Sequence, residues 1–357
     1  MSLKALCVGL SLSLLAPLAT ANPAYRHVVV VVLENSQYKQ IIGSRNAPFI
    51  NNRLVKGGVS ISNAFGEQHP SQPNYYWLFS GSNQGITSDD PPWPSTDPGP
   101  VFSASNLWLS LSQKPPSANF FLGYVDSGTS QPVTNFYEST GTYATKHVPW
   151  LGFTNINNGN PQGVTRDFGS QFPKDAKGFE SLPTIAFVIP AQNHDMHSYN
   201  DAGDSVTNYR QSVVAVRAGD RWLEENIWPY AQWAIKHDSL LIVTMDEDST
   251  PDWPTPRSQT GGGLRGPLNP EGLTAPNLRF QETASTSGPN QIPMIFYGAK
   301  LTRKGHYRLP GKGANNINLL RTLESFYELS ASGAQSTLCL EAGLSDGPIT
   351  AIFKQTP

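Results

Sequence analysis

The sequence contains few charged residues, and charges of the two signs nearly balance. Charged side chains make up 15% of its 357 residues, and the formal net charge is -2. Soluble domains usually carry roughly 25% charged residues. A surface basic enough to hold nucleic acid or an anionic membrane by charge alone is therefore excluded. We expect no nucleic-acid partner.

Long hydrophobic runs are also missing, apart from one short run over residues 5–18. That run is too short for a membrane-spanning helix, which needs about 20 residues. Lys4 precedes it and Ala-Thr-Ala follows it at residues 19–21, as in a signal peptide with its cleavage site. We therefore predict a signal peptide over residues 1–21, a single domain over residues 22–357, no transmembrane segment, and a secreted or periplasmic protein. The alternative interpretation of the run is a buried N-terminal helix.

Cysteine is almost absent, with two residues in the whole chain. Cys7 lies in the predicted signal peptide, so the mature chain would keep Cys339 alone. No intramolecular disulfide is then expected. A chain of this length buries a core large enough to fold without a covalent cross-link.

Glycine and proline are abundant, at 31 and 30 residues, and they separate short apolar segments. Uninterrupted apolar runs of this kind are typical of parallel strands covered on both faces. The predicted strands are residues 27–33, 58–64, 120–125, 184–189, 240–245 and 293–297. Amphipathic patterns predict helices over residues 206–235, with a break at Pro229, and over residues 318–329, with Asn318 as the N-cap. The alternation predicts an α/β fold with a doubly wound, mostly parallel sheet flanked by helices.

Three long loops rich in Gly and Pro interrupt this pattern, over residues 84–119, 128–177 and 249–289. Loops of this length inside one domain are usually functional or disordered. We expect them to be insertions that cover the active site.

Polar side chains follow the predicted strands where each strand ends. Glu34 and Asn35 come after the first strand, Asp195 after the fourth, and Asp246 and Glu247 after the fifth. Ligands of open parallel sheets bind at the carboxyl ends of the strands. Carboxylates gathered there repel one another unless a cation lies among them. The pattern therefore predicts a divalent metal ion bound by oxygen ligands, to which nearby histidines could add nitrogen ligands. Each acid taken alone has a second interpretation, as a helix cap or a solvated side chain.

Ser71 lies between Pro70 and Pro73, just before a predicted helix. Proline suits the first turn of a helix, and the N–H groups of that turn attract anions. A serine there can act as a nucleophile when a metal ion or a base activates its hydroxyl. Asn74 could donate a hydrogen bond to the same anion. Metal, nucleophile and anion site together indicate phosphoryl or sulfuryl transfer; the alternative is that Ser71 only caps the helix.

Two rival chemistries do not fit the residues. No serine has the Gly-x-Ser-x-Gly setting that a serine–histidine–aspartate hydrolase uses. Sulfatases have an arginine two residues after the proline that follows the nucleophile. Tyr75 occupies that position here.

Five motifs resemble those of one family in the same order along the chain. They are His27-Val-Val-Val-Val-Val-Leu-Glu-Asn-Ser-Gln-Tyr, His69-Pro-Ser-Gln-Pro-Asn-Tyr, Lys146-His147-Val-Pro-Trp, Ile189-Pro-Ala-Gln-Asn-His-Asp-Met-His197 and Val243-Thr-Met-Asp-Glu-Asp248. The sequence between about residues 27 and 329 thereby resembles the phosphoesterase family of secreted acid phosphatases and phosphocholine-type phospholipases C, in the alkaline phosphatase superfamily. An alkaline-phosphatase-like fold follows from this resemblance.

The resemblance implies a role for each matching residue. Ser71 would be the nucleophile that becomes phosphorylated, and Asn74 would steady the phosphoryl oxygens. The implied metal ligands are Glu34, Asn35, Ser71, Asp246 and Glu247. The implied phosphate pocket contains His69, His147 and Asp195, with His194 and His197 moving protons. A protonated imidazole would suit an acidic pH optimum.

Gln291 departs from the superfamily pattern, because two-metal members often carry a histidine there. The expected cofactor is therefore one divalent ion, and the alternative is two. Shorter members of the family resemble acid phosphatases, so we expect hydrolysis of small phosphomonoesters. One alternative is a phospholipase C or lipid phosphatase with Trp77, Trp93, Trp108 and Trp150 as an apolar rim, unless these tryptophans only pack the loops. The other is a non-catalytic protein that binds phosphate or lipid.

Overall fold

The structure is a computed structural model that describes residues 22–115, 120–249, 290–311, 313–333 and 347–355. The predicted signal peptide, both cysteines and almost all of the third long loop lie outside these residues.

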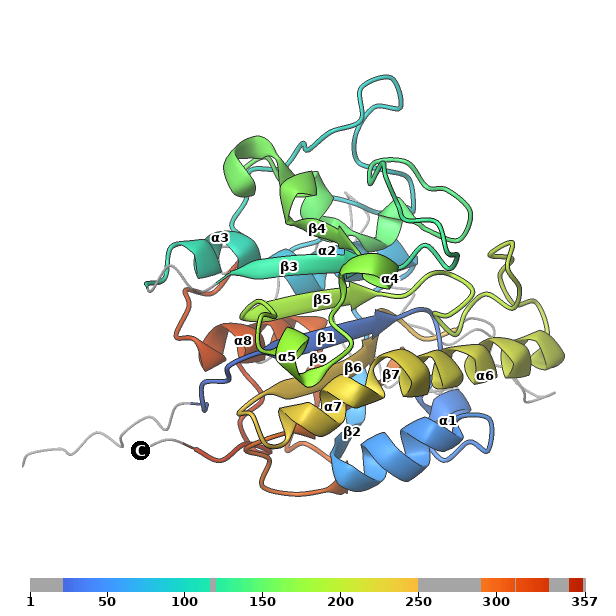
Figure 1. The fold of residues 1–357 in the computed structure, drawn as a ribbon, viewed down its shortest axis with the longest axis vertical. Coiled ribbons are helices and arrows are strands. Elements are labelled where there is room, and N and C mark those ends of the chain that lie inside the picture. Colours follow the sequence, from blue (N-terminus) through green and yellow to red (C-terminus); the bar gives the residue numbers. More distant parts are fainter. Residues whose placement is uncertain (1–21, 116–119, 250–289, 312, 334–346, 356–357) are drawn as a thin grey trace, which may run out of the picture.

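A single sheet of nine strands forms the centre of the described chain (Figure 1). Its strands follow the order β4-β3-β5-β1-β6-β7-β2-β8, and β9 also pairs with β2. The strands are β1 Val28–Leu33, β2 Val59–Phe65, β3 Phe121–Val125, β4 Thr165–Asp167, β5 Ile185–Ile189, β6 Leu240–Met245, β7 Gln291–Gly298, β8 Gly305–Tyr307 and β9 Ala314–Asn315. All six predicted strands are present, with ends shifted by at most two residues.

The sheet is mixed but mostly parallel. β1 pairs in parallel with β5 on one side and β6 on the other, and β3 continues the parallel arrangement to β4. Only β7 runs against its neighbours β6 and β2 in the described chain. The predicted doubly wound α/β fold is confirmed.

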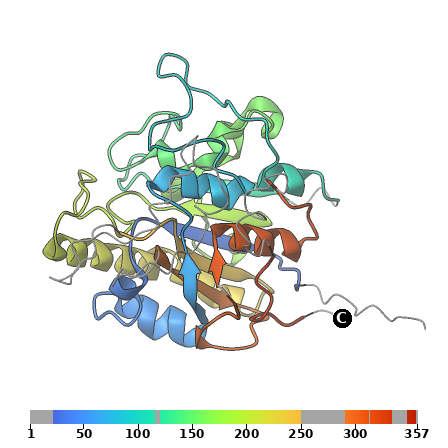
Figure 2. The same cartoon turned by 180° about the vertical axis from the view of Figure 1, so that it is seen from behind.

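Helices cover both faces of this sheet. α6 and α7 lie in front of it in Figure 1, whereas α2 and α8 lie in front of it in the reverse view of Figure 2. The helices are α1 Tyr38–Ile41, α2 Ser71–Ser80, α3 Leu107–Ser112, α4 Phe168–Gln171, α5 Ala176–Phe179, α6 Tyr209–Asn226, α7 Trp228–Ala234 and α8 Asn316–Phe326. The long loops also contain short 3-10 helices, among them η2, Thr145–His147.

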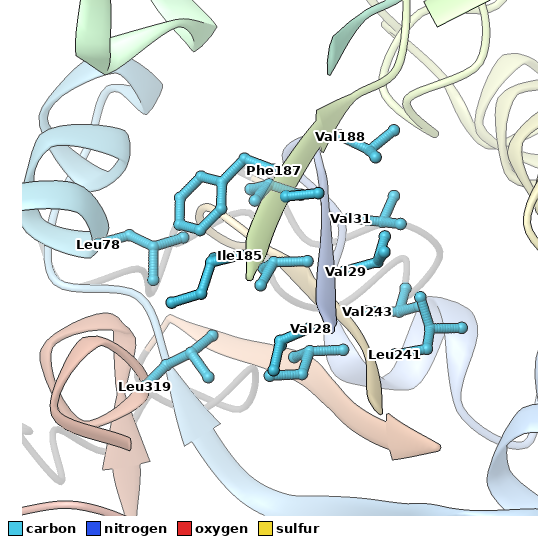
Figure 3. Close-up of a cluster of buried hydrophobic side chains, with 14 of the residues drawn as sticks. Val28, Val29, Val31, Leu78, Ile185, Phe187, Val188, Leu241, Val243 and Leu319 are labelled. Atoms are coloured by element: carbon cyan, nitrogen blue, oxygen red, sulfur yellow. The ribbon is translucent and has the colours of Figure 1, made fainter. Parts of the chain in front are cut away.

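Alternating side chains of the central strands form two apolar layers (Figure 3). Ile185 and Phe187 of β5 point toward Leu78 of α2 and Leu319 of α8, while Val188 points to the opposite face. These side chains are at most 1% exposed. Burial on both faces explains why the strands are apolar at consecutive positions.

Three local predictions need correction. The break at Pro229 is real, but Pro229 lies in the first turn of α7 and does not end α6. The N-cap of α8 is Asn315, whose side chain accepts the N–H of Asn318. Ser71 is the first residue of α2 and does not precede it.

Candidate active site

Three acidic residues meet at the carboxyl edge of the parallel strands. Glu34 follows β1, and its N–H donates to the carbonyl of Asp195 at 2.9 Å. Asp246 follows β6, and its N–H donates to the carbonyl of Leu33 at 3.1 Å. The pairing of β1 with β5 and β6 therefore brings together residues that are far apart in the chain.

Ser71 lies against this cluster at the N-terminus of α2. Its hydroxyl donates to Oε1 of Glu34 and lies 3.1 Å from Oε1 of Glu247. The side chain is buried, with 2% exposure. The two acids that contact Ser71 come from the ends of β1 and β6, so the hydroxyl faces the sheet edge.

Asn74 holds the loop that leads into Ser71. Its Oδ1 accepts the N–H groups of Glu67 at 3.1 Å and Gln68 at 3.0 Å. Its Nδ2 donates to the carbonyl of Gln68 at 2.7 Å and lies 3.5 Å from Oε2 of Glu247. These bonds close the loop against the first turn of α2, and the predicted contact of Asn74 with phosphate stays a prediction.

Glu34 is surrounded by donors and by positive charge. Tyr75 donates its hydroxyl proton to Oε2 of Glu34 at 3.1 Å, while His147 Nε2 lies 3.3 Å and Lys146 Nζ 3.7 Å from Oε1. Burial alone would raise the pKa of Glu34, but the charges of His147 and Lys146 outweigh it and hold this pKa well below its usual range. Glu34 is therefore an ionised acceptor for the Ser71 hydroxyl.

Asn35 joins the two acids that follow β6. Its N–H donates to Oδ1 of Asp246 at 2.9 Å, and its side-chain Nδ2 donates to Oε1 of Glu247 at 3.1 Å. Burial and the nearby charges of Glu34 and Glu247 raise the pKa of Asp246 well above its usual range. Burial also raises the pKa of Glu247, to about 7, against the opposing charge of His69.

His69 faces the same acids from the loop that leads into Ser71. Its Nδ1 lies 2.5 Å from Oε2 of Glu247, and its Nε2 lies 3.3 Å from Oδ1 of Asp248. Burial would lower the pKa of His69, but Glu247 and Asp248 raise it to about 10. His69 is thus a cation that balances part of the acidic cluster.

The three predicted pocket residues after β5 lie in different surroundings. Asp195 is 2% exposed, and its Oδ1 accepts the N–H of His197 at 2.8 Å. Burial and the charge of Glu34 raise the pKa of Asp195, while burial lowers the pKa of His197. His194 turns toward Asp126 instead, with 3.0 Å between Nδ1 and Oδ2. In the described ranges, no hydrogen bond joins either histidine ring to Ser71.

The donor set fits a hard divalent ion, although no closed ligand cage is formed. Within the described residues, no group of three or more His, Cys, Asp or Glu side chains is arranged to hold a metal ion. Oδ1 of Asn35 and Oδ2 of Asp246, however, are buried and lack a hydrogen-bond partner. Buried oxygens without partners are rare, and carboxylate and amide oxygens are the ligands that such ions prefer.

Four residues that contact the site were not predicted to belong to it. Asp126 directly follows β3, so the rule that found Glu34 and Asp246 also applies to it. Lys146 stands beside the predicted His147. Tyr75 was considered only as the residue that stands where sulfatases have an arginine. Glu67 gives no sequence signal because its hydrogen-bond partners lie in α8.

The apolar rim of tryptophans is not formed as predicted. Trp77 and Trp150 are fully buried and Trp93 is 7% exposed. Trp77 donates to Oε1 of Gln68 at 3.0 Å and Trp150 to Oγ1 of Thr165 at 2.9 Å. These three side chains serve packing, which was the alternative interpretation, and Trp108 is half-buried and also packs against the core.

Comparison with known proteins places the chain in a family. Residues 44–330 match the Phosphoesterase family. The chain is 33% identical over 315 residues to a phosphatidylinositol-3-phosphatase of Mycobacterium tuberculosis, an alignment that covers 88% of this chain and 81% of the relative. It is 23% identical to a probable acid phosphatase of Kluyveromyces lactis, over 64% of this chain and 48% of the relative. The chain thus spans about half the length of that yeast protein.

Solved structures match the chain only at low sequence identity. A protein in the alkaline phosphatase superfamily from Vibrio parahaemolyticus superimposes with a TM-score of 0.48 at 12% identity, over 88% of this chain and 72% of that chain. In the described residues, no helix is both long and apolar enough to cross a membrane.

The chain belongs to the phosphoesterase family. It is a phosphoric ester hydrolase, as the motifs predicted.

Proposed function

We propose that this chain is an exported, single-domain, metal-dependent phosphomonoesterase that forms a phosphoserine at Ser71. The proposal depends mainly on the position of the Ser71 hydroxyl, which lies between Glu34 and Glu247 at the start of α2. A serine among buried carboxylates is placed to lose its proton. The N-terminus of a ten-residue helix beside it favours a phosphate group. The signal-peptide pattern of residues 1–21 supports export.

A divalent ion would be held by Glu34, Asn35, Asp246 and Glu247, with Ser71 as a further ligand. The unpartnered oxygens of Asn35 and Asp246 support this ligand set. When bound, such an ion lowers the pKa of the serine hydroxyl and offsets negative charge on the phosphoryl group.

The residues of the chain divide the reaction between them. Oγ of Ser71 forms a bond to phosphorus while the bond from phosphorus to the leaving oxygen breaks, and the Ser71 proton passes to Glu247, the neighbouring carboxylate whose pKa burial raises. His197 or His194 protonates the leaving oxygen. Water then attacks phosphorus and the bond from phosphorus to Oγ of Ser71 breaks. The histidine takes a proton from the water, Glu247 returns its proton to Oγ, and inorganic phosphate departs. Because burial lowers the pKa of His197, an imidazolium there requires acidic solution, which favours an acidic optimum.

The proposed substrates are phosphomonoesters. Among them, a phosphoinositide is supported by the name of one relative. The Mycobacterium tuberculosis relative, named a phosphatidylinositol-3-phosphatase, aligns over most of both chains. A panel of aryl phosphate, nucleotide, sugar phosphate, phosphatidylinositol 3-phosphate and phosphatidylcholine tests this. Release of phosphate from the first four classes supports the proposal, whereas cleavage of phosphatidylcholine alone supports a phospholipase C.

Ser71→Ala is the direct test of the nucleophile. We expect at least about a 1,000-fold loss of kcat on an aryl phosphate, since nucleophile replacements in hydrolases have effects of this order or larger. Ser80→Ala is the matched control, because Ser80 is equally buried but lies at the far end of α2. Acid-quenched wild-type protein should yield a phosphopeptide that contains Ser71.

Near-normal turnover by Ser71→Ala would contradict the mechanism. A phosphopeptide that maps to another residue would do so as well.

A further inference from the structure

Lys146 brings a positive charge to the site from η2, in the loop between β3 and β4. Its Nζ lies 3.7 Å from Oε1 of Glu34 and 2.7 Å from Oδ2 of Asp89. Among the lysines and arginines of the described ranges, it is the one that pairs with Glu34. Glu34 also accepts the hydroxyl of Ser71, so the ammonium group and the nucleophile share one carboxylate.

Asp89 ties the ammonium group to the helix that carries the nucleophile. Oδ2 of Asp89 accepts from Lys146 at 2.7 Å, and its Oδ1 accepts the N–H of Gln72 at 3.0 Å. Gln72 directly follows Ser71 in the first turn of α2. One carboxylate thus sets the position of Lys146 relative to the Ser71 backbone.

The other basic side chains of the site are less available to a substrate. His147 is fully buried, with its ring stacked on that of Tyr75 at 4.9 Å between centroids. His69 already faces the acids at 2.5 and 3.3 Å. The Lys146 side chain keeps 23% exposure, and Asp89 is the one hydrogen-bond acceptor it has in the described residues. An ammonium group has three donors, so two remain for a ligand.

Charge favours such a ligand contact. A phosphomonoester at Ser71 would approach the ionised carboxylate of Glu34, and like charges repel. The 3.7 Å separation from Glu34 exceeds a hydrogen bond, so Lys146 is not committed to that acid.

We propose that Lys146 binds a non-bridging phosphoryl oxygen of the substrate and that Asp89 is a positioning residue for it. The proposal rests on the proposed function of Ser71. It also gives a basis for specificity. A monoester presents up to two negative charges and a free oxygen to the ammonium group, whereas a diester presents one charge and has that oxygen esterified.

The first experiment measures inorganic phosphate binding by calorimetry in the Ser71→Ala background, which cannot form the phosphoserine. Lys146→Met should weaken phosphate binding at least tenfold, and Lys146→Arg should restore part of the loss. Asp89→Asn, which keeps Lys146 but weakens its anchor, should give a smaller loss. Lys114→Met is the control, since Lys114 lies outside the site and its Nζ is 3.0 Å from Oε2 of Glu328.

The second experiment compares aryl monoester and diester hydrolysis with Ser71 present. Lys146→Met should reduce kcat/KM for the monoester at least tenfold more than for the diester, with an unchanged unfolding temperature. Unchanged phosphate affinity in Lys146→Met, or equal losses on both esters, would overturn the proposal and leave Lys146 as a counter-ion of Glu34. If Lys146→Met does not fold, monoester and diester hydrolysis are compared in Asp89→Asn instead. Failure of the Ser71 mechanism would show separately, as turnover by Ser71→Ala itself.

Discussion

Glu67 permits a quantitative test of the electrostatics beneath the loop that leads into Ser71. Its side chain is 5% exposed and accepts from Nδ2 of Asn316 at 2.9 Å and the N–H of Ile317 at 3.0 Å. Burial raises the pKa of Glu67 to about 8, and these hydrogen bonds oppose the shift only in part. The folded protein therefore keeps a proton on Glu67 at pH values where the unfolded chain has lost it.

The sign of the effect follows from proton binding in the two states. The ordinary pKa of 4.5 applies to the unfolded chain, so between about pH 4.5 and 8 the folded state binds one more proton. The stabilisation that Glu67 contributes is fully present below pH 4.5. It falls by about 1.4 kcal/mol per pH unit as the pH rises from there to about 8. The total loss by pH 8 is about 5 kcal/mol, as an upper bound.

Glu67→Gln removes this titration because its amide is neutral at every pH. We expect the free energy of unfolding of the variant, relative to wild type, to rise by about 3–5 kcal/mol between pH 5 and pH 8.5. Urea denaturation at intervals of half a pH unit measures it. Glu225→Gln, at an exposed position of α6, is the control and should show no such trend. A difference between Glu67→Gln and wild type that does not change with pH would refute the reasoning.

Two further predictions concern the metal and the packing behind the site. Dialysis against a chelator should abolish hydrolysis of an aryl phosphate, and a divalent ion should restore it; activity that survives in metal-free protein would argue against the ligand set. Gly123→Ala should lower stability by about 1–3 kcal/mol, because its Cβ would lie 2.0 Å from the buried ring of Trp150. Gly99→Ala, with no atom within 4 Å of the added carbon, is the control, and equal melting temperatures for the two variants would contradict this account.

The sequence predicted the strands well because their signal is local. β6 has the predicted bounds, since all six of its side chains are buried. Ligands gather at the carboxyl ends of parallel strands, and this rule correctly predicted that Glu34 lies beside Asp246 and Asp195. Both predictions depend on burial and on strand direction, which apolar runs reveal.

Features that depend on backbone angles or on distant partners were not predictable. Three asparagines lie between residues 315 and 318, and only the extended backbone of Asn315, with φ of -135°, identifies it as the cap of α8. The amide of Asn74 bonds the loop backbone, which a sequence pattern cannot distinguish from an amide that points at a ligand. Trp77 is fully buried and its indole N–H donates to Gln68, a partner nine residues away.

The position of Ser71 depends on a chain crossing that the strand order imposes. β2 is separated from β1 by β6 and β7 in the sheet, so the segment after β2 must turn back across the edge to bring Ser71 to Glu34. Gly66 begins that crossing with a bond to the carbonyl of Asn290 at 2.9 Å, and any Cβ there would lie 2.7 Å from the carbonyl oxygen of Asp246. Asn290 then accepts the N–H of Asp248 at 2.6 Å. Ser71 is therefore positioned by contacts between the loop after β2 and the segment that carries Asp246 and Glu247. These contacts explain how a serine that follows β2 reaches acids that follow the central strands.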